Sequence, residues 1–187
     1  MSVTEAIEQR YPRGVIRSVL YEDDEARMRE FMEAACEGIA NPRIAEIGTY
    51  IGVSASILCD YGHVDTFDVA ANSAFNRTVR VLGIPEGIVT RHVCEPGELL
   101  QLIVSLGPFD IGHIDGDHEY EAVKKDFEAL KTCSAILFHD YGKLPMRGGR
   151  AQVGVNRFIE ELDPACWVDM EPFAAVYPGR MTEHARR

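Results

Sequence analysis

Short apolar runs alternate with amphipathic stretches along most of this chain, and that alternation restricts the possible folds more than any other feature. The runs RIAEI, VDTFDV, GIVTRHV, FDIGHI and SAILFHD have the length of buried strands, and segments with helical periodicity separate them. Strands joined by crossover helices pair in parallel, with the helices packed on the sheet faces. The pattern therefore predicts an α/β fold built on a doubly wound, mostly parallel sheet.

The sequence predicts helices in six segments. In the first, apolar residues recur at i, i+3 and i+4 from a cap at Asp23 or Asp24 as far as Ile39, and Asn41-Pro42 ends the helix. The helix expected over 119–131 has one apolar face and one charged face, which suits a helix lying on a sheet. The other helices are expected from about residue 53 and around 73–82, 96–105 and 152–162.

Two further apolar runs near the C-terminus, CWVDM and FAAVYP, are separated only by Glu171-Pro172. Strands this close together pair antiparallel. We therefore expect a Rossmann-like, seven-stranded, mostly parallel sheet with a C-terminal antiparallel hairpin. It would form a single domain over residues 1–187, with a core at about 25–177, a flexible N-terminal segment and a flexible 180–187 tail.

The formal net charge of −11 makes nucleic acid an unexpected partner, because a phosphate backbone would be repelled. The arginines of MRGGR and of the C-terminus are interpreted as a solvated loop and tail. No run approaches the ~18 apolar residues of a membrane span, so we expect a soluble, cytoplasmic protein without a membrane partner. The five scattered cysteines match neither a zinc pattern nor a disulfide framework and are expected to be reduced.

The stretch EIGTYIG lies where the first strand should turn into a helix. Gly48 and Gly52 would let a ligand approach the backbone there, since glycine has no Cβ. The spacing is G-x-x-x-G, so the G-x-G-x-x-G fingerprint of dinucleotide-binding proteins is incomplete. Asp68 ends the next apolar run, where a carboxylate can accept hydrogen bonds from ribose hydroxyls. Together with the acidic Glu46, these residues favour a ligand-binding turn over a purely structural one.

Acidic and histidine side chains end two neighbouring strands. Asp115 should follow the fourth strand, and His139 and Asp140 should end the fifth, so one edge of the sheet should hold all three. Their residue types suit acid-base chemistry or metal binding. Asp117 and His118 lie in the loop after the fourth strand, where a helix N-cap is the favoured interpretation of Asp117. The histidines expected to be packed or exposed without a role are His63, His92, His113 and His184.

Both segments resemble a known family. EIGTYIGVSAS resembles the first motif of class I S-adenosylmethionine-dependent methyltransferases, in particular their small-molecule O-methyltransferase branch. IDGDHEYEAVKKDFEAL and AILFHDY resemble a subgroup that includes macrocin O-methyltransferase-like enzymes. With the strand order, the resemblance covers about residues 25–177. It implies an enzyme that methylates an oxygen of a small hydroxylated metabolite, such as a sugar or a natural-product scaffold.

The resemblance also implies where S-adenosylmethionine would bind. Glu46 and Gly48 would line its methionine end, and Asp68 would hold its ribose. Cys94 and Glu95, just after the third strand, would lie beside the adenine. The remaining cofactor-binding positions that it implies are Tyr50, Gly52, Ser54 and Asp115.

A divalent cation such as Mg²⁺ is a further implication, since metal-dependent members of this fold place acidic or amide ligands after the fourth and fifth strands. Asp115 and Asp140 match those positions, whereas His139 stands where catechol-type members carry an acidic ligand. Imidazole is a softer ligand than Mg²⁺ prefers, so the need for a metal is left open. His139 or His118 would be the catalytic base, and a cation at Asp115 and Asp140 would stabilise the acceptor oxygen.

Two alternatives remain open from the sequence. A metal-dependent hydrolase would use the same acids and histidines but would leave Gly48 and Asp68 without a role. A non-catalytic methyltransferase-like protein would bind a nucleoside or a protein partner. In an enzyme, the segment 142–150 could close over the substrate as a lid. That loop, or the partner subunit of a homodimer, would complete the pocket for a small-molecule acceptor.

Overall fold

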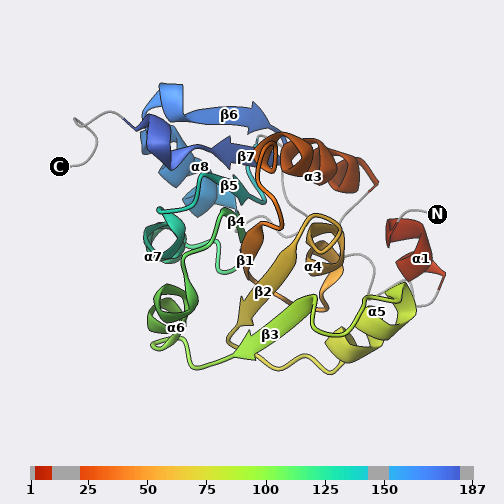
Figure 1. Ribbon diagram of the computed structural model, residues 1–187. Helices are drawn as coiled ribbons and strands as arrows, with labels where there is room; N and C mark the ends of the chain where they lie inside the picture. Colours follow the sequence, from red (N-terminus) through yellow and green to blue (C-terminus); the bar gives the residue numbers. More distant parts are fainter. Residues whose placement is uncertain (1–2, 10–21, 143–151, 182–187) are drawn as a thin grey trace.

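A computed structural model of the protein describes residues 3–9, 22–142 and 152–181. They form a seven-stranded sheet with the order β3-β2-β1-β4-β5-β7-β6 (Figure 1). The strands are β1 (Arg43–Ile47), β2 (His63–Asp68), β3 (Val89–Val93), β4 (Ile111–Ile114), β5 (Ala135–Phe138), β6 (Trp167–Met170) and β7 (Phe173–Val176). β1 to β5 are parallel, and β7 is antiparallel to β5 and β6. The predicted mostly parallel sheet with a C-terminal antiparallel hairpin is confirmed.

Helices cover both faces of this sheet. They are α1 (Val3–Glu8), α3 (Glu22–Ala35), α4 (Val53–Leu58), α5 (Ala74–Leu82), α6 (Leu99–Leu106), α7 (Tyr120–Leu130) and α8 (Gln152–Glu161), with short 3-10 helices at Pro164–Cys166 and Pro178–Arg180. α3, α4 and α5 pack on one face and α6, α7 and α8 on the other, while α1 lies beside α4 and α5 (Figure 1). Within the described ranges, no helix has the length and apolar character that a membrane span requires.

Strand alternation sends side chains into two separate cores. On β5, Leu137 packs in the core under α3, whereas Phe138 packs in the core under α7. On β4, Ile111 lies under α3. His113, two residues later on the same strand, therefore faces the α3 side as well, and it is completely buried there.

The parallel register decides which strand ends meet. Ile47 of β1 is opposite Ile114 of β4, and Ile114 is opposite Phe138 of β5. The next residues of these strands therefore lie side by side at the carboxyl edge of the sheet, where doubly wound folds bind their ligands. Those residues are Gly48, Asp115 and His139.

Some helix boundaries differ from the predictions. α3 ends at Ala35 rather than Ile39, because the chain then enters a turn in which Gly38 has a φ of +79°. α6 begins later than expected, at Leu99. α1 was not predicted at all, and its Ile7 is completely buried. The flexibility expected of the N-terminal segment stays a prediction, and within that segment the structure adds this helix.

Candidate active site

The turn after β1 needs its two glycines for packing. Gly48 has a φ of +98°, and a Cβ at this position would lie 2.0 Å from the backbone oxygen of Asp115. Gly52 has a φ of +82°, and its Cβ would lie 2.6 Å from the ring of Phe75. The protein itself fills both spaces, which differs from the predicted reason for glycine here. The close contact also shows that the turn and the end of β4 belong to one site.

Glu46 uses both of its carboxylate oxygens inside the sheet. Oε2 accepts a hydrogen bond from Thr66 Oγ1 at 2.6 Å, and Oε1 lies 3.2 Å from His113 Nδ1. Because the single hydroxyl proton of Thr66 goes to Glu46, Thr49 donates to Thr66 at 2.7 Å. All four side chains are buried. Glu46 therefore joins β1 to β2 and β4, and its predicted contact with a cofactor stays a prediction.

Asp68 both ends β2 and holds the turn after β1. Its Oδ2 accepts a hydrogen bond from the Tyr50 backbone N–H at 2.9 Å, and its Oδ1 accepts one from Ala70 at 3.0 Å. Around it, the side chains of Tyr50, Val69 and Val93 are about half exposed, at 48%, 50% and 47%. This stretch of the carboxyl edge therefore combines a carboxylate with exposed apolar surface, which suits a nucleoside.

The other predicted cofactor positions lie around the same edge. Ser54 is buried in the first turn of α4. Cys94 is partly buried just beyond β3, and its backbone N–H donates to the Asp68 carbonyl at 3.2 Å. Glu95 follows it and is exposed. The ends of β1, β2 and β3 thus bring Tyr50, Asp68, Cys94 and Glu95 to one edge of the sheet.

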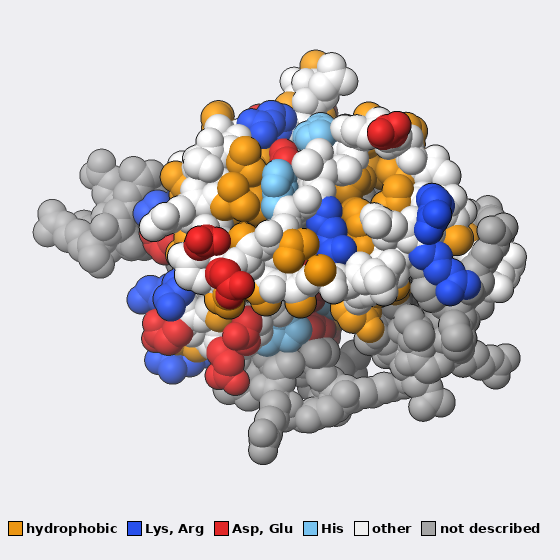
Figure 2. Space-filling model, turned by 90° about the horizontal axis from the view of Figure 1, so that it is seen from below, with side chains coloured by type: hydrophobic (Ala, Val, Ile, Leu, Met, Phe, Trp, Pro, Cys, Tyr) orange, Lys and Arg blue, Asp and Glu red, His pale blue; other side chains and the backbone are white. Residues whose placement is uncertain are grey.

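Four ionisable side chains converge where β4 and β5 end, and we call Asp115, His118, His139 and Asp140 the rim cluster. His139 Nδ1 lies 3.0 Å from Asp115 Oδ1 and 3.6 Å from Asp140 Oδ1. His118 Nε2 lies 3.5 Å from Asp115 Oδ1 and 3.3 Å from Asp140 Oδ2. Figure 2 shows a face of the molecule on which histidine and acidic side chains adjoin one another among hydrophobic ones. The predicted convergence of the two strand ends is confirmed.

The donor atoms of this cluster suit a metal ion. One ligand atom each from Asp115, His139 and Asp140 lies within 4.8 Å of the other two. Two carboxylates and an imidazole form a donor set that divalent cations accept in proteins. These are the three residues that the sequence predicted as ligands, so the residues present fit the predicted cation.

His139 and Asp115 stabilise each other's charged forms. Burial alone would lower the pKa of His139, but the charges of Asp115 and Asp140 and the Asp115 hydrogen bond outweigh it and raise the pKa to about 9. Burial would raise the pKa of Asp115, but the charge of His139, the contact with His118 and the hydrogen bond with His139 hold it well below its usual range. At neutral pH this pair is therefore an imidazolium beside a carboxylate.

The pKa values of His118 and Asp140 are both raised. Burial would lower the pKa of His118, but the Asp115 carboxylate 3.5 Å from its Nε2 and the charge of Asp140 raise it. Burial raises the pKa of Asp140, and the charges of Asp115 and Asp24 oppose the lowering effect of the two histidines. The cluster therefore concentrates proton-binding groups with displaced affinities, as catalytic sites do.

Three residues that support the rim were not singled out for it by sequence. Asn156 of α8 clamps Gly142, accepting from its N–H at 3.0 Å and donating to its carbonyl at 2.7 Å. Gly154 lets α8 approach the rim loop, because a Cβ there would lie 2.1 Å from the backbone oxygen of His118. Asp24 of α3 is buried, and its charge acts on the rim. A glycine and an asparagine two residues apart on a helix, such as Gly154 and Asn156, do not predict contacts of this kind from sequence.

The other residues considered from sequence, where the structure describes them, make contacts within the protein. Asp117 Oδ1 accepts from the Glu119 N–H at 3.0 Å, but the N-cap of α7 is Glu119, so the N-cap interpretation of Asp117 is wrong by two residues. His63 and His92 share Asp65, with Nε2 to carboxylate distances of 3.6 Å and 2.8 Å. His184 and the predicted lid, apart from its first residue, lie outside the described residues.

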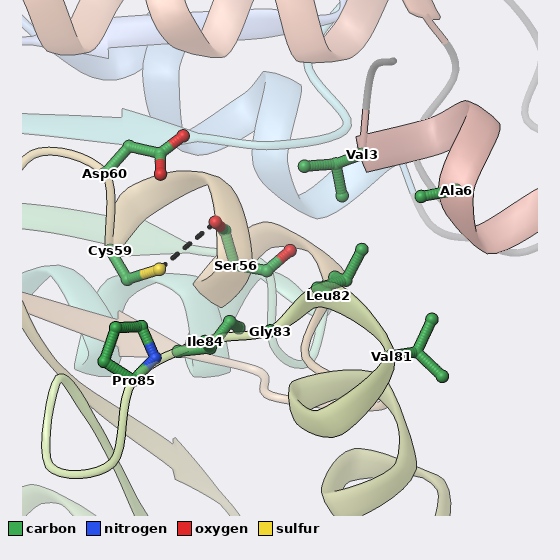
Figure 3. A pocket seen from close by; sticks show the side chains of 10 residues that line it. All are labelled: Val3, Ala6, Ser56, Cys59, Asp60, Val81, Leu82, Gly83, Ile84 and Pro85. Carbon is green, nitrogen blue, oxygen red and sulfur yellow. Dashed lines mark hydrogen bonds between the residues drawn. The ribbon is translucent and has the colours of Figure 1, made fainter.

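A cavity of about 260 Å³ lies away from the rim, at the opposite edge of the sheet. α4 starts at the carboxyl end of β1 and runs back, so Cys59 and Asp60 at its end lie at the amino edge. In Figure 3 they line the cavity with residues of α1 and of the loop after α5, and Cys59 Sγ donates to the Ser56 carbonyl. The cavity therefore has no part in the rim chemistry.

Comparison with protein families matches residues 45–141 to a family model described as "Methyltransferase domain". The matched segment contains the turn after β1, Asp68 and the whole rim cluster. No curated protein matches the chain by sequence.

Several solved structures share the fold. An O-methyltransferase from Bacillus cereus, in complex with S-adenosylhomocysteine, is 19% identical with a TM-score of 0.64, over 95% of this chain and 91% of that chain. CalS11, a TDP-rhamnose 3'-O-methyltransferase of calicheamicin biosynthesis, is 14% identical with a TM-score of 0.61, over 93% and 86%. MycE from the mycinamycin biosynthetic pathway, in complex with Mg and S-adenosylhomocysteine, is 18% identical with a TM-score of 0.61, over 98% and 56%.

Proposed function

The chain belongs to the methyltransferase domain family, and we propose that it transfers the methyl group of S-adenosylmethionine to a hydroxyl oxygen of a small molecule. The predicted enzyme class, an S-adenosylmethionine-dependent methyltransferase, is confirmed by this membership. The observation that carries the proposal is the backbone contact between Gly48 and Asp115. It puts the turn expected to receive the methyl donor next to the acids and histidines that would act on the acceptor.

The methyl donor would lie over the carboxyl ends of β1, β2 and β3. Asp68 would accept hydrogen bonds from the ribose hydroxyls, for which the oxygens at this strand end are suited. The half-exposed Tyr50, Val69 and Val93 would contact the apolar adenine, with Cys94 and Glu95 beside it. S-adenosylhomocysteine in the B. cereus and MycE structures supports this donor.

Asp115, His139 and Asp140 would hold a divalent cation, because their ligand atoms already lie within 4.8 Å of one another. When bound, the cation would stabilise the negative charge that develops on the acceptor oxygen. Mg in the MycE structure supports a cation in this fold, although the imidazole of His139 is softer than the ligands Mg²⁺ prefers.

His118 would be the base in this reaction. The acceptor oxygen attacks the methyl carbon, the bond from that carbon to sulfur breaks, and S-adenosylhomocysteine leaves with the electron pair. The hydroxyl proton passes to His118, which belongs to the rim cluster but is not one of the three proposed ligands of the cation, so its imidazole remains able to accept a proton. His139 is the poorer base, because as a ligand of the cation its imidazole would give its free electron pair to the metal.

The acceptor would be a sugar or a natural-product scaffold. CalS11 and MycE, which share the fold, are described as enzymes of calicheamicin and mycinamycin biosynthesis, which supports this class. The net charge of −11 supports a small molecule over nucleic acid, and a homodimer in the cytoplasm is part of the same proposal. The hydrolase alternative is not retained, since it gives no role to the matched turn and Asp68.

Methyl transfer can be tested with radiolabelled S-adenosylmethionine and a panel of phenols, nucleotide sugars and macrolide glycosides. The proposal predicts a labelled methyl ether with at least one acceptor and its loss in Asp115→Asn. His63→Gln, a histidine outside the rim, should keep the activity. Binding of S-adenosylhomocysteine without transfer to any hydroxyl would instead favour the non-catalytic alternative.

A further inference from the structure

We propose that α3 supplies a third carboxylate, Asp24, to the cation site at the rim, and that it replaces the negative charge which His139 does not provide. This inference rests on the cation site of the proposed function. Sequence alone indicates only a helix cap at Asp23 or Asp24, and the first turn of α3 lies 91 residues before Asp115 in the chain.

The direction of α3 brings its first turn to the carboxyl edge. α3 ends at Ala35, and the chain then turns directly into β1 at Arg43, which starts at the amino edge of the sheet. The last turn of α3 therefore lies at the amino edge and its first turn, with Asp24, at the carboxyl edge. Figure 1 shows α3 packed along the sheet beside β7 and β5.

The buried face of α3 then aims Asp24 at the rim. Met28 is completely buried and packs in the same core as Leu137 of β5. Asp24 lies four residues before Met28, one turn nearer the carboxyl edge on the same helix face. His139 lies two residues after Leu137, on the same side of β5 and also nearer that edge. Matched steps along the helix and the strand therefore bring Asp24 toward His139.

Burial and electrostatics agree with this placement. Asp24 is only 6% exposed, which is unusual for a carboxylate outside a charged or metal-binding environment. The charge of Asp24 acts on both His139 and Asp140. Asp24 is therefore within electrostatic range of both residues.

This third acid changes the character of the site. Asp115, Asp140 and the imidazole of His139 alone supply two negative charges, and imidazole is not a preferred ligand of a hard cation. Asp24 adds a third charge from outside the group of direct ligands, where surrounding carboxylates tune metal affinity. With it, the site suits a hard divalent cation despite the histidine.

The test is Mn²⁺ binding to the whole protein in the presence of S-adenosylhomocysteine, followed by the electron paramagnetic resonance of free Mn²⁺. Asp24→Asn should weaken binding about tenfold, as the loss of a supporting carboxylate does. Asp23→Asn is the matched control, because Asp23 is exposed in the same helix turn and carries the same charge. A thermal melt and a calorimetric titration with S-adenosylhomocysteine establish that each variant is folded, and Asp24→Ser serves if the Asn variant is not.

Each outcome decides the inference. Weaker binding in Asp24→Asn with wild-type binding in Asp23→Asn supports it. Unchanged binding in Asp24→Asn, or equal weakening in both variants, overturns it and leaves the cation site standing. If the wild-type protein binds S-adenosylhomocysteine but no Mn²⁺, the cation site fails and the inference fails with it, while methyl transfer itself is unaffected.

Discussion

His139 Nδ1 lies 3.0 Å from Asp115 Oδ1, although 24 residues separate the two in the chain. The contact arises because β4 and β5 are parallel neighbours in register, Ile114 opposite Phe138, so the residues after them emerge together. It joins an acid and a base at the edge of the sheet that also carries the turn after β1. The following predictions test what this arrangement does.

Asp140→Asn should weaken Mn²⁺ binding about 10- to 100-fold, because it removes one of two ligand carboxylates while keeping the size of the side chain. Affinity for S-adenosylhomocysteine, measured by calorimetry, should stay unchanged. Asp169→Asn, on the exposed edge strand β6, is the control. Equal Mn²⁺ affinity in wild type and Asp140→Asn would show that Asp140 is no ligand.

His118→Gln should lower kcat about 100-fold or more for any acceptor that the wild-type enzyme methylates, since it removes the proposed base. KM for S-adenosylmethionine should change little, because His118 lies beyond the expected donor site. The rates come from S-adenosylhomocysteine release, with His63→Gln beside them. A larger loss in His139→Gln than in His118→Gln, at saturating Mg²⁺, would assign the base to His139.

Gly48→Ala should destabilise the fold by about 3 kcal/mol, because the new Cβ meets the Asp115 backbone and φ is positive. Gly83→Ala is the matched control, since Gly83 also has a positive φ, +66°, but open space around it. It should cost only about 1 kcal/mol. Urea unfolding measures both, and equal losses would mean that the contact with Asp115 is unimportant.

Asp126→Asn should stabilise the protein at alkaline pH. Burial and the nearby charge of Asp117 raise the pKa of Asp126 to about 7, so the folded state resists the ionisation that the unfolded chain undergoes near pH 4. Wild-type stability should therefore fall as the pH rises from about 4 to 7, and the variant should gain roughly 2 kcal/mol or more above that range.

Urea titrations of Asp126→Asn and wild type at pH 4, 6 and 8 would measure this difference. Glu121→Gln, an exposed acid on the same helix, should show no such trend. A stability difference that is the same at all three pH values would rule out ionisation of Asp126 as its cause.

The parts of the site that follow from strand ends could be predicted from sequence. Asp115, His139 and Asp140 end apolar runs, and parallel pairing brings such ends to one edge regardless of side-chain detail. The C-terminal hairpin was likewise predicted from sequence, because two short apolar runs lie on either side of Glu171-Pro172. Alternation and strand length are local properties, which is why these expectations were confirmed.

Other parts depend on contacts across the sheet that no local pattern reveals. The register places Glu46 between Thr66 and His113, where it makes hydrogen bonds inside the protein that the sequence did not predict. From sequence, Asp24 was interpreted only as a possible helix cap. Its burial could not be predicted, because it depends on how α3 packs across the strands. Sequence shows which face of a helix is apolar but not what that face meets.

The most direct test of the account is calorimetric titration of the wild-type protein and of Asp68→Asn with S-adenosylhomocysteine. Glu86→Gln, an exposed acid in the loop before β3, is the control, and thermal melts establish folding. We expect the wild type and Glu86→Gln to bind alike and Asp68→Asn to bind at least about tenfold more weakly, because a charged acceptor for ribose hydroxyls is lost. A folded wild-type protein that does not bind, or an Asp68→Asn variant that binds as tightly as the wild type, would contradict it.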